Sequence, residues 1–541
     1  MSVAPEHLII APIVVPFLAG ALTLIYDERQ RRAKLGIGLV SCAITLLAAI
    51  ELLVRSKGSE LSGGNDIGFY LLGDWPAPYG IVLVVDRLSA MMLVLTSLLA
   101  LPALVFSAAG IHRQGQHFHA MFQFLLMGLN GAFLTGDLFN LFVFFEILLA
   151  ASYGLLLHGG GEAKVRAGLH YIAINLVASL LFLVGVSLVY GVTGTLNMAQ
   201  LVQLVPALTE DQRPLFHAGC AIMAVAFLVK AGVWPLSFWL PSAYAAGAAP
   251  VAALFAMMTK VGVYVLIRLS LLIFGTHAGA SAGFGAEVLV AGGLATVTFG
   301  LFGILASRDV ERVAAFLIMV SSGTVMAAAG TVAGGGPVGV LSAALFYMIG
   351  STLAVSAVFL LVEPMRRLGG EVELISDTLA DDYDDPDDDP RPEVVLAFPG
   401  TVTILGLAFT LTMIAAAGLP PLSGFIGKLG MVQGLLDLTS RASWAWGFIT
   451  LLFLSGFATL LATLRIGIRT FWGSEPVEPP RILALELAPI LLLVALLVLL
   501  SAKAEVTLGY MTDTTDALLQ PTIYAEGVLG APRAEDAGEM E

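Results

Sequence analysis

Four ionisable residues lie inside long apolar stretches of this sequence: Glu146, Lys230, Lys260 and Lys428. If those stretches cross a membrane, each charge costs at least about 2.5–3.5 kcal/mol on insertion scales and is retained for a reason. Burial disfavours the charged form of a lysine, whereas a nearby carboxylate favours it. A lysine balanced between these effects takes up and releases a proton near neutral pH, so the pattern predicts a proton relay.

Glu146 and Lys230 are the first candidate pair. Glu146 sits in LFVFFEILLAASYG, with no lysine or arginine in its own predicted helix, so its partner must come from another helix. Lys230 is our candidate partner, and positive charge moving near Glu146 would change the proton affinity of the next lysine. The alternative is a static ion pair that only pins two helices together.

The two remaining lysines are candidates for later relay steps. Lys260 lies midway along MMTKVGVYVLIR, and Tyr264, four residues later, shares its helical face. Lys428 follows a proline-broken stretch, in AGLPPLSGFIGKLGMVQG, where close packing explains the glycines but not the lysine. The alternatives are that Lys260 snorkels to a membrane interface and that Lys428 has a packing role alone.

The histidines carry a weaker signal. His112, His117 and His119 cluster in one predicted loop, where we expect them to be solvated, and no carboxylate or cysteine accompanies them, so we expect no metal site. His158 and His170 flank the loop GGGEAKVRAG and are candidates for collecting protons, with a packing or interfacial role as the favoured alternative. No nucleotide loop, catalytic triad or haem motif occurs, so we expect no cofactor and no nucleic-acid partner.

Composition identifies the elements that must hold these residues. Hydrophobic residues make up 58% of the 541 residues, charged residues 12%, and mean hydropathy is +0.91, whereas soluble domains have about 45–50% apolar and about 25% charged residues. Stretches of roughly 20 apolar residues, enough to cross a bilayer, recur along the chain. They predict an all-α integral membrane protein of about fourteen helices surrounded by lipid, at 8–26, 36–54, 84–108, 119–135, 138–158, 169–191, 217–246, 250–274, 287–306, 313–332, 338–362, 396–437, 444–471 and 483–501.

Two of these spans are too long and too proline-rich to be straight helices. Pro235 and Pro241 interrupt 217–246, and Pro420 and Pro421 interrupt 396–437. Paired broken helices in two halves of a chain are the best sequence pointer to the site of an inverted-repeat transporter. We therefore expect two related halves, each with one broken helix beside a deep lysine.

A proline also frees the backbone carbonyl four residues before it. Pro235 frees the carbonyl of Ala231, and Pro421 frees that of Ala417. Freed carbonyls at membrane depth are tolerated only inside protein or beside water. The sequence therefore predicts polar surroundings at both breaks.

The distribution of lysine and arginine predicts the orientation of the chain. With the N-terminus outside, the inside loops hold 15 basic residues and the outside segments hold 6, as the preference of basic loops for the cytoplasm requires. We therefore expect both termini outside and the acidic run at 376–393, within the loop 363–395, inside and solvated. Arg87 and Arg268 lie near span ends, where they are expected to reach the interface.

Several of these stretches also resemble a known family. LNGAFLTGDLFNLFVFFEILLAASYGLLLHG at 129–159 is similar to the D subunits of Mrp-type multisubunit sodium/proton antiporters. KAGVWPLSFWLPSAYAAGAAPVAALFA at 230–256 and AGLPPLSGFIGKLGMVQG at 417–434 resemble the broken helices of that family and of the antiporter-like subunits of respiratory complex I. DRLSAMMLVL at 86–95 and SRDVERVAAF at 307–316 extend the resemblance over nearly the whole chain.

The resemblance implies a fold and a role. It implies fourteen helices with two inverted five-helix repeats, divided here as an N-terminal segment, two repeats and C-terminal helices with an outside tail, at 1–108, 109–275, 276–440 and 441–541. Glu146 and Lys230 would be the family's carboxylate–lysine pair, Lys260 the central relay lysine and Lys428 the terminal one. It also implies exchange of protons for sodium in the cell membrane, within a complex of about seven membrane subunits and without a redox cofactor.

One position departs from the family pattern. Where relatives often carry a lysine or histidine in the eleventh helix, this chain has Gly350, Ser351 and Thr352. Water held by Ser351 and Thr352 is one way to bridge the gap, and a different path between the two halves is another. Two other interpretations stay open: a proton-pumping subunit of an NADH:quinone oxidoreductase or membrane-bound hydrogenase, and a scaffold whose charges only hold helices together.

Overall fold

The computed structural model of the chain describes residues 7–57, 67–368, 395–396, 400–440, 442–471 and 482–531. Thirteen of its helices are long and apolar enough to cross a membrane, and α4 (Phe118–Leu134) is a shorter apolar helix. Together they account for the fourteen predicted spans. The thirteen are α1 (His7–Ile25), α2 (Arg31–Arg55), α3 (Arg87–Ser107), α5 (Leu138–Leu157), α6 (Glu162–Thr193), α8 (Gln212–Ala231), α10 (Ala249–Leu272), α11 (Ala286–Ala306), α12 (Val310–Ala333), α13 (Val338–Leu368), α15 (Gly400–Ala417), α17 (Trp444–Phe471) and α18 (Ala484–Ala502).

Shorter elements connect these helices. A two-stranded antiparallel hairpin of β1 (Gly68–Leu71) and β2 (Val82–Val85) pairs Gly68 with Val85, and β2 is buried. A second pair joins β3 (Val395–Leu396) to β4 (Ile482–Leu483). The short helices are η1 (Leu72–Asp74), η2 (Ile111–Arg113), α7 (Met198–Leu204), η3 (Val205–Ala207), α9 (Leu240–Ala246), η4 (Thr276–Ser281), α16 (Ser423–Leu436), α19 (Ala504–Leu518) and α20 (Pro521–Leu529).

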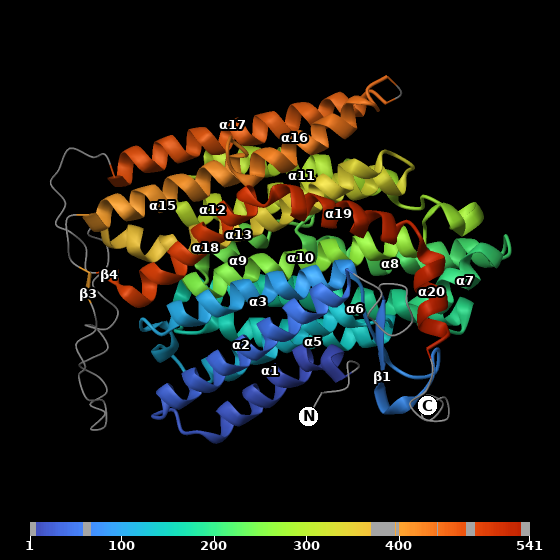
Figure 1. The fold of residues 1–541 in the computed structure, drawn as a ribbon, viewed down its shortest axis with the longest axis horizontal. Helices are drawn as coiled ribbons and strands as arrows, with labels where there is room; N and C mark the ends of the chain where they lie inside the picture. Colours follow the sequence, from blue (N-terminus) through green and yellow to red (C-terminus); the bar gives the residue numbers. More distant parts are fainter. Residues whose placement is uncertain are drawn as a thin grey trace.

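The long helices run side by side, with α1 at one edge of the bundle and α17 at the opposite edge (Figure 1). Between them, α10 is buried along its whole length, and α12 and α13 are buried nearly throughout. A helix that is apolar on all sides belongs in the centre of a membrane bundle. Large apolar side chains stay exposed on the peripheral helices, as expected of a surface that faces lipid or other membrane subunits.

Both predicted helix breaks are present. The first span divides into α8, which ends at Ala231, and α9, which begins at Leu240. The second divides into α15, which ends at Ala417, and α16, which begins at Ser423. The breaks are confirmed, because each span contains a non-helical segment at its prolines.

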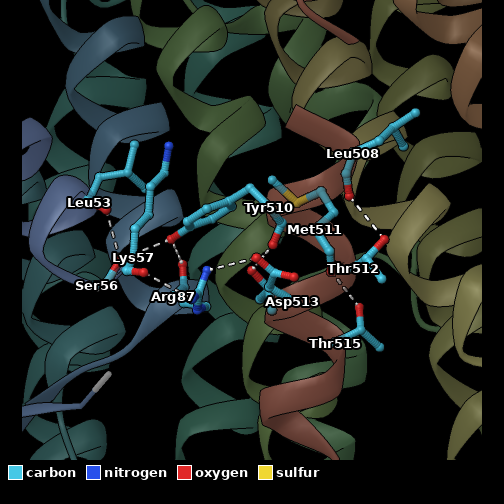
Figure 2. A network of polar contacts seen from close by, with 11 residues as sticks. Leu53, Ser56, Lys57, Arg87, Leu508, Tyr510, Met511, Thr512, Asp513 and Thr515 are labelled. Carbon is cyan, nitrogen blue, oxygen red and sulfur yellow. Dashed lines mark hydrogen bonds and ion pairs between the residues drawn. The ribbon is translucent and has the colours of Figure 1, made fainter. Parts of the chain in front are cut away.

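The C-terminal region differs from the predicted tail. We expected an outside tail after the last span, and in the structure two further helices, α19 and α20, follow that span and pack against α13 and α7. Figure 2 shows how α19 is fastened: the Tyr510 hydroxyl donates to the Arg87 carbonyl at 2.7 Å and lies 3.2 Å from Ser56 Oγ. Asp513 pairs with the Arg87 guanidinium at 3.2 Å. We call these contacts the C-terminal clasp; they join α19 to the end of α2 and the start of α3.

The acidic run at 376–393 lies outside the described residues.

Candidate functional site

Lys230 is fully buried near the end of α8, at the first helix break. Its ammonium donates a hydrogen bond of 3.4 Å to the Tyr171 hydroxyl, which lies 2.7 Å from Ser152 Oγ. The ammonium also lies 5.8 Å from the ring centre of Phe145 and 5.7 Å from that of Tyr171. Two aromatic rings therefore surround a cation that has one hydroxyl partner, a setting that cation–π attraction favours.

The Glu146 carboxylate is half-buried on α5 and accepts a hydrogen bond from Ser179 Oγ of α6. No ion pair joins it to Lys230 among the residues that the structure describes. The two residues lie on neighbouring helices, since the Lys230 ammonium is 5.8 Å from the ring centre of Phe145, the residue before Glu146 on α5. The static ion pair, which was the alternative interpretation, is not formed among the described residues, and the coupling between the two residues stays a prediction.

Lys260 is buried at the centre of the bundle and points to hydroxyl groups of α12. Its ammonium donates to Ser321 Oγ at 2.8 Å and to Ser322 Oγ at 3.3 Å. Ser321 Oγ in turn lies 2.7 Å from Ser351 Oγ on α13. One hydrogen-bonded chain therefore crosses α10, α12 and α13. Thr352, the other predicted bridging residue, donates instead to the backbone carbonyl of Met348 at 2.6 Å.

Lys428 lies on α16 just after the second break. Its ammonium donates to the Ala417 carbonyl at 3.0 Å, the Leu452 carbonyl at 3.1 Å and Ser455 Oγ at 3.2 Å. Ala417 carries the carbonyl that Pro421 was predicted to free. A Cβ at Gly456 would lie 2.5 Å from the Ala417 oxygen, so only glycine lets α17 approach this closely.

The eleventh helix packs closely at Gly350. A Cβ at Gly350 would lie 2.6 Å from Ser423 Oγ, at the start of α16. Any side chain at position 350 would therefore have to displace the Ser423 hydroxyl at this contact between α13 and α16. Ser423 Oγ is buried without a hydrogen-bond partner among the described atoms. Fewer hydrogen bonds are therefore available between Ser351 and Lys428 than between Lys260 and Ser351.

The candidate proton-collecting histidines differ in their surroundings. His158 caps the end of α5, is buried, and lies 3.0 Å through Nε2 from the Ile111 carbonyl. Burial lowers the pKa of His158, and the hydrogen bond to Ile111 offsets this only in part. His170 is exposed on α6 and contacts the Arg166 carbonyl at 2.9 Å. Neither contacts a relay lysine in the described part of the chain, and their role stays a prediction.

Two of the three loop histidines are buried, whereas all three were expected to be solvated. His112 and His119 lie with ring centroids 5.3 Å apart, and both are almost fully buried, whereas His117 is exposed. Burial, with His119 and Arg113 nearby, lowers the pKa of His112 to about 3. Within the described ranges, no group of three or more metal-binding side chains is placed to hold a metal ion.

A buried ion pair at the far end of α10 was missed from the sequence. Arg268 does not reach the interface as expected: the residue is 5% exposed, and its guanidinium makes a two-pronged contact with Asp86, the N-cap of α3. It also donates to the Tyr264 hydroxyl at 2.9 Å. Burial alone raises the pKa of Asp86, but the Arg268 charge and hydrogen bonds outweigh it and hold that pKa below its usual value. The capping pattern Asp86-x-x-Ser89 was the available signal.

This pair lines a cavity of about 320 Å³ between the hairpin end, α3, α10, α19 and α20. Arg87, Asp513, Asp516 and Tyr524 also line it. Because α19 and α20 were not expected, the cavity that they close was not expected either.

Comparisons with known proteins show which family the chain resembles over nearly its whole length. A sequence profile described as "NADH:quinone oxidoreductase/Mrp antiporter, TM" matches residues 135–380. The chain is 51% identical over 539 residues to the probable K(+)/H(+) antiporter D subunit of Rhizobium meliloti (strain 1021), covering 98% of each. It is 34% identical to the Na(+)/H(+) antiporter D subunit of Alkalihalophilus pseudofirmus, covering 97% of this chain and 99% of that protein. Its fold matches a chain of the Mrp complex from Dietzia sp. DQ12-45-1b with a TM-score of 0.82 and 26% identity, over 97% of this chain and 99% of that one.

Proposed function

This chain belongs to the D-subunit family of Mrp-type multisubunit cation/proton antiporters, and from that premise we propose that Lys230, Lys260 and Lys428 relay the protons. It is a transporter subunit that works in a hetero-oligomeric membrane complex. The observation that carries the proposal is the burial of all three lysines with no carboxylate in contact among the residues that the structure describes. Each ammonium is stabilised by neutral oxygen atoms, so each can lose its proton without leaving an unpaired buried carboxylate.

The route follows the three lysines through the bundle. Lys230 lies at the first break, Lys260 at the centre and Lys428 at the second break. The Ser321–Ser351 contact extends the reach of Lys260 towards the second half of the chain. Glu146 acts through space on Lys230, and such coupling is strong because the effective dielectric constant of a protein interior is lower than that of water.

We propose a monovalent cation as the exchanged ion. Of the two relatives above, the one named for potassium is 51% identical and the one named for sodium 34%, which favours potassium as the first ion to test. We further propose that the complex lies in the plasma membrane with both termini of this chain outside, because basic residues concentrate in the loops assigned to the cytoplasm.

The test is cation-dependent dissipation of a pH gradient in everted vesicles that contain the whole complex. Glu146→Gln and Lys260→Met are compared with wild type, and Glu162→Gln, at the exposed start of α6, is the matched carboxylate control. We expect the first two variants to lose most of the exchange while native gels show an intact complex. Normal exchange in both would remove these residues from the mechanism and leave a scaffold role for the buried charges.

Adding K⁺ and Na⁺ in separate runs identifies the exchanged ion. A response to only one of them assigns that ion to the complex, and equal responses assign both. If neither cation collapses the pH gradient of a complex that native gels show to be intact, the antiport proposal itself is overturned.

A further inference from the structure

We propose that the three oxygen atoms around Lys428 Nζ form a binding site for a monovalent cation, which a free cation and the lysine ammonium occupy in turn. We call this set the oxygen cage: the Ala417 carbonyl, the Leu452 carbonyl and Ser455 Oγ. The inference rests on the proposed antiport function and adds the place where the cation binds.

The first argument is the chemistry of the oxygen cage. A lysine ammonium has three hydrogen-bond donors, and here the three partners are two backbone carbonyls and one hydroxyl at 3.0, 3.1 and 3.2 Å. No carboxylate contacts Nζ among the described residues. Neutral carbonyl oxygens of this kind replace the hydration shell of potassium in selective pores. The ammonium therefore stands where the centre of an alkali cation would lie.

The second argument is the position of the oxygen cage in the fold. Ala417 is the last residue of α15, so its carbonyl lies at the helix C-terminus, which carries roughly half a negative charge. Ends of broken half-helices and unwound carbonyls coordinate cations at the midplane of secondary transporters. Gly456 allows α17 to come close enough to contribute Leu452 and Ser455.

The third argument is charge balance. When Nζ loses its proton to the relay, the neutral amine keeps two N–H donors and gains a lone pair that faces carbonyl oxygens. That arrangement is unfavourable, and the flexible side chain can withdraw. A monovalent cation then restores the single positive charge that the oxygens had stabilised. One proton leaves as one cation enters, which is the exchange that an antiporter requires.

Lys260 provides a matched comparison within the same chain. It is equally buried, but its ammonium contacts two serine hydroxyls, and no backbone carbonyl accepts from it in the described structure. Both α10 and α12 are continuous helices at this point, so their own backbone carbonyls are used within the helices. Removing Lys260 should therefore leave a pocket that holds no cation.

The experiment measures equilibrium binding of radioactive Rb⁺ and Na⁺ to the purified whole complex, without a pH gradient. We expect Lys428→Ala to bind about one more cation per complex than wild type and Lys260→Ala to bind no more than wild type. Adding Ser455→Ala to Lys428→Ala should weaken that extra binding about tenfold, since one of three ligands is lost. Equal cation binding by Lys428→Ala and Lys260→Ala would overturn the proposal.

A second Lys428 variant and a comparison with the exchange measurements complete the experiment. Lys428→Ser is the second variant in case Lys428→Ala does not assemble on native gels, and it has the same expected outcome. Because binding is measured without transport, extra cation binding by Lys428→Ala together with normal exchange in both Glu146→Gln and Lys260→Met would support the oxygen cage and remove the relay. Lost exchange in Glu146→Gln without extra cation binding in either Lys428 variant would support the relay and overturn the oxygen cage.

Discussion

The hydroxyl oxygens of Ser321 and Ser351 lie 2.7 Å apart at the contact between α12 and α13. Ser321 also accepts a hydrogen bond from the Lys260 ammonium at 2.8 Å. A proton on Lys260 is thus connected to a helix that has no ionisable side chain at this level. We propose that Ser351 extends the reach of the central lysine at the place where the family pattern has a lysine or histidine.

Ser351→Ala should slow cation/proton exchange about tenfold, because one hydrogen bond contributes roughly 0.5–1.5 kcal/mol. Exchange is measured in everted vesicles. Ser356→Ala is the matched control on the same helix, since its hydroxyl donates to the Ala253 carbonyl at 2.8 Å, a contact away from Lys260 and Ser321. Equal rates for the two variants would show that Ser351 takes no part in proton transfer.

Tyr171→Phe should destabilise the first half of the chain by about 1–3 kcal/mol, because it leaves the buried Lys230 ammonium without its hydroxyl partner. The measurement is the thermal midpoint of the detergent-solubilised complex, together with its exchange rate. Tyr153→Phe is the control, because Tyr153 packs edge-on against Tyr171 but is only partly buried. A Tyr171→Phe midpoint that matches the control would contradict the assigned contact.

Asp86→Asn should be among the most destabilising single substitutions, by about 3–5 kcal/mol, because it leaves the buried Arg268 charge without its carboxylate partner. The double variant Asp86→Asn/Arg268→Met should lose less than the sum of the two single losses. Glu51→Gln, in an exposed pair with Arg55, should cost less than about 1 kcal/mol. Additive losses in the double variant would show that the two residues are not coupled.

The burial of His112 leads to a prediction of how the stability of the folded chain depends on pH. Its pKa falls from 6.5 to about 3 in the folded chain, so the unfolded chain binds more protons between these values. The contribution of neutral His112 to the free energy of unfolding is therefore complete above about pH 6.5 and declines as the pH falls towards 3. At pH 5 the loss is about 2 kcal/mol.

His112→Gln should reduce the drop in thermal midpoint between pH 7 and pH 5, because glutamine does not titrate. His170→Gln, at an exposed histidine on α6, is the control. Unchanged pH dependence in His112→Gln would mean that His112 is not held neutral by burial.

Hydrophobic runs predicted the membrane helices well, because every span must satisfy the same length and polarity demands. The two breaks were predictable for a similarly local reason: Pro235 and Pro421 remove backbone donors wherever they occur. The partner of Lys428 was partly predictable too, since the freed Ala417 carbonyl had to find a donor. All of these inferences use only residues that are near each other in sequence.

Contacts between distant residues were not predictable. Nothing in the sequence near Lys260 points to Ser321 or Ser351, because serines are common in membrane helices and their partners depend on packing. The same holds for Arg268, whose partner Asp86 is 182 residues away. The helices α19 and α20 were missed because they carry more polar residues than the spans that precede them.

The C-terminal clasp has a consequence for how the protein is made. Tyr510 and Asp513 hold the start of α3, yet they are synthesised more than 400 residues after Arg87. While the chain is being inserted, the start of α3 and the Arg268–Asp86 pair therefore lack a covering segment that the ribosome has not yet produced. A prematurely terminated chain would keep its lysines but lack the cover over this charged end, which gives membrane quality control a feature by which to tell a finished subunit from an unfinished one.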